Sequence, residues 1–393
     1  MAKEFFQVSK SIEWEKEVGA MFQAKNGIRS IVITIVVALM GISTLAEALP
    51  NYYPKDYSKI IDASRAEKGL LIYSNMATDN WKPILAAFNK HYPWIEVKTL
   101  DLNSGEVFQR FIAESEGGIA TADFLVTQPP NGWARMLKEN RAFRYASPEI
   151  PYLAKWASRQ EEVYTFSCDP SIIVWNTKII PADMIPKGLA DLAEKAKKKP
   201  DFFRGRLTCY NDTSTYGIFG AWGLYKHHGE KFWTWMDVIG PLSRPESSGG
   251  AQLEKILSGE YMMSYNVGVI TLAVSSVKKA GKLLGWKYME DGNIVLVRGM
   301  AIPKKAVNVN SAKLLLDFIL SREGQVAMTK GNFTAYRADA AGEIAEPQLH
   351  LDRLIKIVGE KNAVIIGADP DYGDQAKFKA IRERWRQAYF GKK

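Results

Sequence analysis

The stretch that most constrains the fold is residues 163–180, VYTFSCDPSIIVWNTKII. Valine, isoleucine, tyrosine, phenylalanine and tryptophan favour a pleated, half-buried backbone, so the residues on either side of Asp169 predict two β-rich runs. Pro170 cannot donate to a sheet ladder and marks an edge, a bulge or a break between the runs. We interpret the stretch as a strand that crosses between two lobes. Two ordinary strands of one sheet, joined at Asp169 and Pro170, are the alternative.

The length of the chain predicts more than one core. A single core rarely grows beyond roughly 250–300 residues, and this chain has 393. Hydrophobic residues make up 47% of it, which is enough for packed cores and argues against disorder. The formal net charge is +9, but Lys and Arg are scattered along the chain apart from residues 195–199. We therefore expect a solvated basic surface and no nucleic-acid partner.

Residues 1–48 have the three parts of a secretory signal. A positive flank around Lys25 precedes an apolar run at 31–40, and small residues at 46–48 fit a cleavage site. The run is shorter than the roughly 20 residues that span a bilayer, and an uncleaved N-terminal anchor is the alternative. Because the segment before Lys25 is long for a signal, we hypothesise that translation starts at Met21. No cysteine follows the signal, which argues against a lipid anchor.

The chain has two cysteines, Cys168 and Cys209. In an exported protein, an even number of cysteines is typical of disulfide pairing. Cys168 lies in the crossing stretch and Cys209 lies near the end of a predicted strand at 206–210, so the two can come close together. A disulfide between them is therefore one prediction, and two buried thiols are the alternative.

Strands and helices alternate in the first part of the chain. Apolar runs at 69–73, 95–100 and 122–126 predict strands, and apolar stripes at i, i+3 and i+4 predict the helices that follow. This alternation predicts a parallel α/β sheet, and ligands gather at the carboxyl ends of the strands in such sheets. The rule singles out the residues that follow the first and third strands, which are Ser74, Asn75, Thr127 and Gln128.

Two later helix starts are rich in hydroxyl side chains and glycine. One is at residues 211–216 and the other at 247–250, and a strand is predicted at 261–266. Hydroxyl side chains cap helices, and the free N–H groups of a helix start can also hold an anion. Capping alone explains the residues equally well. The candidate ligand contacts from this part are Thr213, Ser214, Ser247, Tyr265 and Asn266.

Several short stretches resemble bacterial ABC-transporter solute-binding proteins, of the extracellular family 1 that includes ferric-ion binders. They are LLIYSN at 70–75, ADFLVTQ at 122–128, SIIVWNTKII at 171–180, LSGEYMMSYN at 257–266 and GMAIPKKAVNVNSAKLLLDFILSREGQ at 299–325. The resemblance covers roughly residues 68–340. It is spread over many motifs rather than one sharp signature.

The resemblance implies an α/β, two-lobed periplasmic-binding-protein fold of type II, with two crossing hinge strands and a ligand cleft between the lobes. Lobe one would comprise residues 68–170 and 297–393, the latter with the C-terminal helices, and lobe two residues 171–296; a leader at 49–67 would follow the signal peptide at 1–48. Hinge closure on a small-molecule ligand would precede docking on an inner-membrane ABC permease. The protein would be a periplasmic monomer without a cofactor.

The resemblance leaves the solute open. Ferric binders of this kind use two adjacent tyrosines where this chain has Tyr265 and Asn266, and they often add a histidine and a carboxylate from lobe one. This chain has Ser74 and Gln128 near the corresponding positions, which is a poor donor set for Fe(III). A small polar or anionic organic solute is therefore the main prediction. Ferric ion, with Tyr265 as a ligand, is the alternative.

Three arginines could supply a bidentate clamp for an anion. They are Arg244, Arg298 and Arg337, and a surface position is the alternative for each. An enzyme or a sensor module on the same fold is the competing class of function. The sequence has no G-x-S-x-G elbow, P-loop, H-E-x-x-H motif or metal-type cysteine spacing. We therefore predict no catalytic residues.

Overall fold

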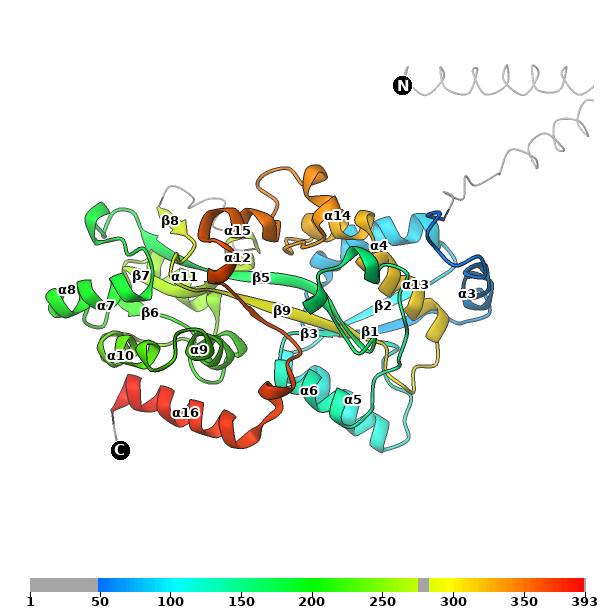
Figure 1. Cartoon of the computed structure of the whole chain (residues 1–393), viewed down its shortest axis with the longest axis horizontal. Helices are drawn as coiled ribbons and strands as arrows, with labels where there is room; N and C mark the ends of the chain where they lie inside the picture. The colour runs from blue at the N-terminus through cyan, green and yellow to red at the C-terminus, as the bar shows by residue number, and fades with distance from the viewer. Residues whose placement is uncertain (1–48, 275–282, 392–393) are drawn as a thin grey trace, which may run out of the picture. The chain divides into compact units, whose positions relative to one another are not determined.

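The computed structural model describes residues 49–274 and 283–391 (Figure 1). The predicted signal peptide and the Met21 start lie outside these residues. The chain divides into two compact units, residues 1–51 and residues 52–393, and every helix and strand below belongs to the second unit. Within the described ranges, no helix is long and apolar enough to cross a membrane.

The predicted alternation of strands and helices is confirmed in the first half of the sheet. Its strands are parallel and have the order β2–β1–β3. The elements, in chain order, are β1 (Leu70–Ser74), α4 (Thr78–His91), β2 (Val97–Asp101), α5 (Ser104–Glu116), β3 (Phe124–Thr127) and α6 (Pro130–Lys138). The stripe of α4 that was predicted to be apolar is buried, with Trp81, Ile84 and Phe88 fully inaccessible.

The crossing stretch is one continuous strand, β5 (Val163–Asn176). Its first part pairs antiparallel with β9 (Asn293–Ala301), and its second part pairs with β7 (Met263–Gly268) and β8 (Leu284–Lys287). The ladder with β9 shifts register between Thr165 and Ser167. Pro170 lies opposite Val295 inside the ladder, so two separate strands joined at Asp169 and Pro170 are not what the chain forms.

The second half of the sheet joins β5 and β7 to β6 (Leu207–Thr208), and the short β4 (Ser158–Arg159) pairs with the start of β5. Helices cover this half, and their side chains form most of its cores. They are α7 (Leu189–Lys198), α8 (Pro200–Phe203), α9 (Thr215–His228), α10 (Glu230–Ile239), α11 (Gly249–Leu257) and α12 (Val269–Val274).

The C-terminal third contributes helices or strands to both halves of the sheet. Helices α13 (Val309–Leu320) and α14 (Arg322–Lys330) pack on the first half with α3 (Ser58–Ser64) and α4. The α-helices and the strand that follow are α15 (Leu351–Val358), β10 (Ala363–Ile366) and α16 (Gln375–Phe390).

The position of helix α16 differs from the expected division of the chain into lobes. Its Ile381, Trp385 and Tyr389 are spaced to form one helix face, and they lie in the same core as the side chains of α9 and α10. Strand β10 pairs with the end of β9 that is nearest to β7 and β8. Strand β10 and helix α16 therefore pack with the second half of the sheet, whereas the expected division assigns all of 297–393 to lobe one.

Candidate functional site

Polar side chains meet where β1 and β3 end. Asn75 follows β1 and Gln128 follows β3, and because these strands are parallel neighbours their carboxyl ends lie together. The Nδ2 of Asn75 donates to the Oγ of Ser104 (2.7 Å) at the start of α5, and lies 3.5 Å from the Oε1 of Gln128. The structure thus brings Asn75 and Gln128 together, as the sequence predicts, and adds Ser104.

Arg298 on β9 extends this polar group onto a crossing strand. Its Nη1 donates to the Oδ1 of Asn75, and its Nη2 lies 3.8 Å from the Oδ2 of Asp169 on β5. The side chain is 4% exposed, and its Nε–H has no hydrogen-bond partner among the described residues. Burial lowers the pKa of the guanidinium, and the carboxylate of Asp169 opposes that change. Arg298 is a buried cation with an unused donor.

Asp169 is the counter-charge of Arg298, and it is fully buried. Its Oδ2 accepts a hydrogen bond from the Oγ of Ser167 (2.8 Å), and its Oδ1 accepts one from the backbone N–H of Thr334 (3.2 Å). Burial raises the pKa of this carboxyl, while Arg298 acts to lower it. A charged residue in each of two apolar strands is the sequence signal that could have identified this pair, and sequence reasoning used Asp169 only as a strand break.

Two of the predicted contacts on the first half have structural roles. The Oγ of Ser74 accepts a hydrogen bond from the indole N–H of Trp81 (3.0 Å), and the Oγ1 of Thr127 donates to the backbone carbonyl of Ser104 (2.9 Å). Both side chains are fully inaccessible to solvent. These bonds fix α4 and α5 against the strand ends that carry Asn75 and Gln128.

The predicted contacts at the helix starts of the second half lie near its surface. The Oγ1 of Thr213 donates to the Oδ1 of Asn211 (2.7 Å), and Ser214 precedes α9. Ser247 is exposed, and it is Ser248 whose Oγ caps α11. For Ser248, which was not among the predicted contacts, capping is therefore the observed role. The structure does not test Thr213, Ser214 and Ser247 as ligand contacts.

Tyr265 on β7 lies inside a packed core. Its hydroxyl donates to the Sγ of Cys209 (3.1 Å) and lies 2.6 Å from the hydroxyl of Tyr389 on α16. Burial raises the pKa of Tyr265 well above its usual range. The adjacent Asn266 donates through Nδ2 to the backbone carbonyl of Tyr216 (3.3 Å). The phenol of Tyr265 is thus engaged by α16, which the sequence did not predict to cover this strand.

The predicted disulfide is wrong, because both cysteines are free and buried. The Sγ of Cys168 faces the backbone carbonyl of Thr334 (3.7 Å). Cys209 instead lies with Tyr265 and Tyr389 in a different core cluster. Burial raises the pKa of Cys209 to about 12, so its thiol stays protonated.

The three candidate arginines have three different environments. Arg244 is exposed, as its surface alternative predicts. Arg337 is buried, and it pairs with Glu149 and with Asp339 (2.7 Å). Of the three, Arg298 is the one beside the polar strand ends. The described residues contain no cluster of three or more His, Cys, Asp or Glu that could hold a metal ion.

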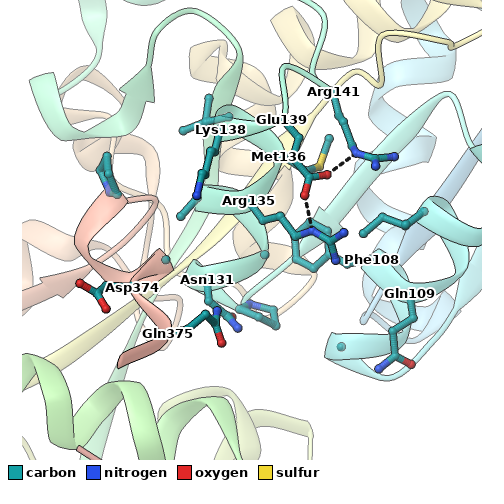
Figure 2. A pocket seen from close by; sticks show the side chains of 18 of the residues that line it. Phe108, Gln109, Asn131, Arg135, Met136, Lys138, Glu139, Arg141, Asp374 and Gln375 are labelled. Atoms are coloured by element: carbon teal, nitrogen blue, oxygen red, sulfur yellow. Dashed lines mark hydrogen bonds and ion pairs between the residues drawn. The ribbon is translucent and has the colours of Figure 1, made fainter. Parts of the chain in front are cut away.

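A groove of about 1520 Å³ runs between α5, α6 and the start of α16 (Figure 2). Phe108 and Met136 contribute apolar surface to it. Its charged side chains are largely paired with one another, Arg135 with Glu139 (2.6 Å) and Arg141 with Glu116 (2.7 Å). Gly105, at the start of α5, lines the groove together with Pro129 and Asn131, which lie at the start of α6 and close to Gln128 in the chain.

Comparison with known proteins identifies the family. Residues 84–349 match the profile of the bacterial extracellular solute-binding proteins, and this match covers more than half of the chain. The chain belongs to this family, whose members bind solutes for transport rather than convert them. The search of curated proteins gave no match.

Solved structures show the same type II periplasmic-binding-protein fold. The substrate-binding protein of an ABC transporter from Agrobacterium tumefaciens has 22% identity and a TM-score of 0.71, covering 82% of this chain and 95% of its own. Iron-bound HitA from Pseudomonas aeruginosa has 19% identity and a TM-score of 0.65, with coverages of 81% and 99%. AfuA from Actinobacillus pleuropneumoniae, solved with fructose-6-phosphate, has 20% identity and a TM-score of 0.64, with coverages of 82% and 99%.

Proposed function

We propose that the protein captures a small polar or anionic organic solute between two lobes and delivers it to an inner-membrane ABC permease. The observation that carries the proposal is the buried guanidinium of Arg298, whose Nε–H has no partner among the described residues. A buried donor without an acceptor costs free energy, roughly 1–3 kcal/mol. A carboxylate or phosphate of a solute would supply the acceptor, and arginine binds such groups in two-pronged geometry.

The lobes of this proposal are the two halves of the sheet. Lobe one carries β1, β2 and β3, and lobe two carries β6, β7 and β8 together with α16. Strands β5 and β9 connect them, and Asp169 and Arg298 lie on these two strands. A solute that contacts both lobes would favour the closed arrangement over the open one, because only the closed form offers both sets of contacts.

The amides of Asn75 and Gln128 would complete the contacts from lobe one. Each amide offers both a donor and an acceptor, so the two suit hydroxyl, carboxylate or phosphate groups. On lobe two, Thr213, Ser214 and Ser247 are the proposed contacts, since they precede helices whose N–H groups can face an anion. The predicted export signal and the membership of an extracellular solute-binding family support a location outside the cytoplasmic membrane, where a permease would receive the solute.

Ferric ion is the competing cargo, and structural relatives such as HitA are described as iron-bound. The phenol of Tyr265 is hydrogen-bonded to Cys209 and close to Tyr389. Its raised pKa opposes the deprotonation that a tyrosinate–iron bond requires. We therefore expect an organic solute.

Native mass spectrometry of the exported protein, purified without unfolding, tests the proposal. The expected result is an additional small organic mass that is lost after unfolding and refolding, and that tandem fragmentation identifies as a polar or anionic compound. A bound iron mass, accompanied by a tyrosinate–iron absorption band, would contradict the proposal in favour of ferric transport. Protein that is consistently empty and takes up no member of a panel of sugar phosphates and carboxylates would also contradict it.

A further inference from the structure

A segment that we call the C-terminal strap, residues 366–375, connects β10 to α16. It contains the short helix η8 (Pro370–Gly373). Figure 1 shows the chain descending from the crossing strands to α6 and turning there into α16. The strap therefore passes from elements of the second half of the sheet to a helix of the first half and back.

The strap is anchored on α9. The ring of Tyr372 packs edge-on against Trp222, with 5.0 Å between ring centroids. The Nζ of Lys226 lies 3.1 Å from a carboxylate oxygen of Asp369 and 3.1 Å from one of Asp371. One lysine thus holds two carboxylates of the strap, next to a buried aromatic contact.

The strap is also seated on the first half of the sheet. Gly373 lies so close to α6 that a Cβ added to it would be 2.9 Å from the Cβ of Ala134, closer than such atoms approach in proteins. Ala368 is buried in a core cluster with Trp133 and Ala301, which belong to α6 and β9. The backbone at Gly373 is not left-handed, so the absence of a side chain matters there for space alone.

We propose that the C-terminal strap is a latch between the two lobes: the contact of Gly373 with Ala134 opposes their separation, and Lys226 holds the strap in place. The proposal rests on the two-lobed closure proposed above and adds a control of it that involves no solute contact. The strap residues Asp374 and Gln375 also line the groove of Figure 2, together with residues of α5 and α6. Movement of the strap would therefore change the width of that groove.

Distances between spin labels test the latch without any solute. Labels at Lys138→Cys on α6 and Lys231→Cys on α10 report on the separation of the lobes, since both positions are exposed and the two native cysteines are buried. Gly373→Val should lengthen the mean distance, because its side chain would meet Ala134. Adding Ala134→Gly should return the distance toward that of the parent.

Gly342→Val is the matched control for the glycine substitution, because nothing lies within 4 Å of a Cβ at Gly342. It should leave the distance distribution unchanged. Lys226→Met should broaden the distribution, because it releases Asp369 and leaves Asp371 paired only with Lys377 of α16, while Ala134 and Gly373 stay in place.

Unchanged distributions in Gly373→Val and Lys226→Met, with melting curves like the parent, would overturn the latch. If Gly373→Val fails to fold, Lys226→Met decides: broadening supports the latch and an unchanged distribution overturns it. These distances are measured on solute-free protein. Failure of the latch is therefore distinguishable from failure of the proposed solute binding, which native mass spectrometry tests.

Discussion

The described part of the chain has two buried arginines with carboxylate partners, and they differ in how completely they are paired. Arg337 contacts Glu149, donates to Asp339 (2.7 Å) and donates to the backbone carbonyl of Leu320 (3.0 Å). Arg298 lies 3.8 Å from Asp169 and has an unpartnered Nε–H among the described residues. The guanidinium of Arg337 is saturated, which means that its donors are hydrogen-bonded within the protein. The guanidinium of Arg298 keeps one donor that a ligand could use.

The carboxylate sides of the two pairs differ in the same way. Glu149 also accepts hydrogen bonds from the hydroxyls of Tyr52 (3.0 Å) and Tyr53 (2.6 Å), which come from the leader. Asp169 has Ser167 and the backbone of Thr334. The comparison indicates that burial alone does not mark a binding arginine, whereas burial with incomplete pairing at the junction of two lobes does.

The largest expected effect is on the saturated pair. Arg337→Met leaves Glu149 buried without its cation, and breaking a buried ion pair in this way costs about 3–5 kcal/mol. Urea unfolding should show a loss of that size in the free energy of unfolding. Arg244→Met, at an exposed arginine, is the control and should change it by less than about 0.5 kcal/mol. Equal losses of unfolding free energy in Arg337→Met and Arg244→Met would contradict the claim that the buried pair of Arg337 stabilises the fold.

A buried carboxyl group that interacts electrostatically with Glu149 predicts a pH dependence. Asp317 on α13 accepts hydrogen bonds from Tyr57 (2.6 Å), Tyr145 (2.6 Å) and Ser147 (2.5 Å), and burial raises its pKa to about 7. The fold holds this proton more tightly than the unfolded chain. Its stabilising contribution is complete below the unfolded pKa near 3.8 and is lost as pH rises to about 7.

The free energy of unfolding, measured between pH 3.8 and about 7, checks whether stability falls as pH rises. The free energy of unfolding should decrease by at most about 1.4 kcal/mol per pH unit. Asp317→Asn should make this decrease smaller. A slope that is the same in the parent and in Asp317→Asn would show that other groups set the pH dependence.

A smaller loss of stability is expected at the incompletely paired arginine. Arg298→Met removes two contacts to Asn75 and one long contact to Asp169, and hydrogen bonds to charged groups are worth about 1.5–3 kcal/mol. Asp169 keeps its other two partners and can take up a proton, since its pKa is already raised. A loss as large as that of Arg337→Met in the same urea experiment would remove the contrast between the two pairs.

The smallest effect is expected at Tyr265. Tyr265→Phe removes a buried hydroxyl from the group with Cys209 and Tyr389, which should cost about 0.5–1.5 kcal/mol in the free energy of unfolding. The amount of co-purified solute should not change. Tyr225→Phe, whose hydroxyl donates to Glu230 at the surface, is the matched control. Loss of the co-purified solute in Tyr265→Phe but not in Tyr225→Phe would indicate that Tyr265 contacts the solute.

Local sequence patterns were sufficient to predict the first half of the sheet and the crossing strand. The spacing of Trp81, Ile84 and Phe88 predicts a helix with one buried face, and the parallel order then places Asn75 beside Gln128. These inferences need only neighbouring residues and the rule that parallel strands end together.

Long-range pairing explains what the sequence could not predict. Tyr265 is engaged by Tyr389, more than a hundred residues later, and no local pattern at Tyr265 reports that α16 covers it. The partner of Arg298 is on another strand, so its burial depends on the ladder between β5 and β9. Cys168 and Cys209 were expected to approach each other, but they point into different cores.

Titration calorimetry with the solute released from the native protein tests the central claim most directly. The solute would be titrated into refolded parent protein, Arg298→Met and the exposed-site control Arg244→Met. We predict parent-like affinity for Arg244→Met and an affinity weaker by about tenfold or more for Arg298→Met, the equivalent of one lost charged hydrogen bond. Undiminished affinity in a folded Arg298→Met protein would contradict the account.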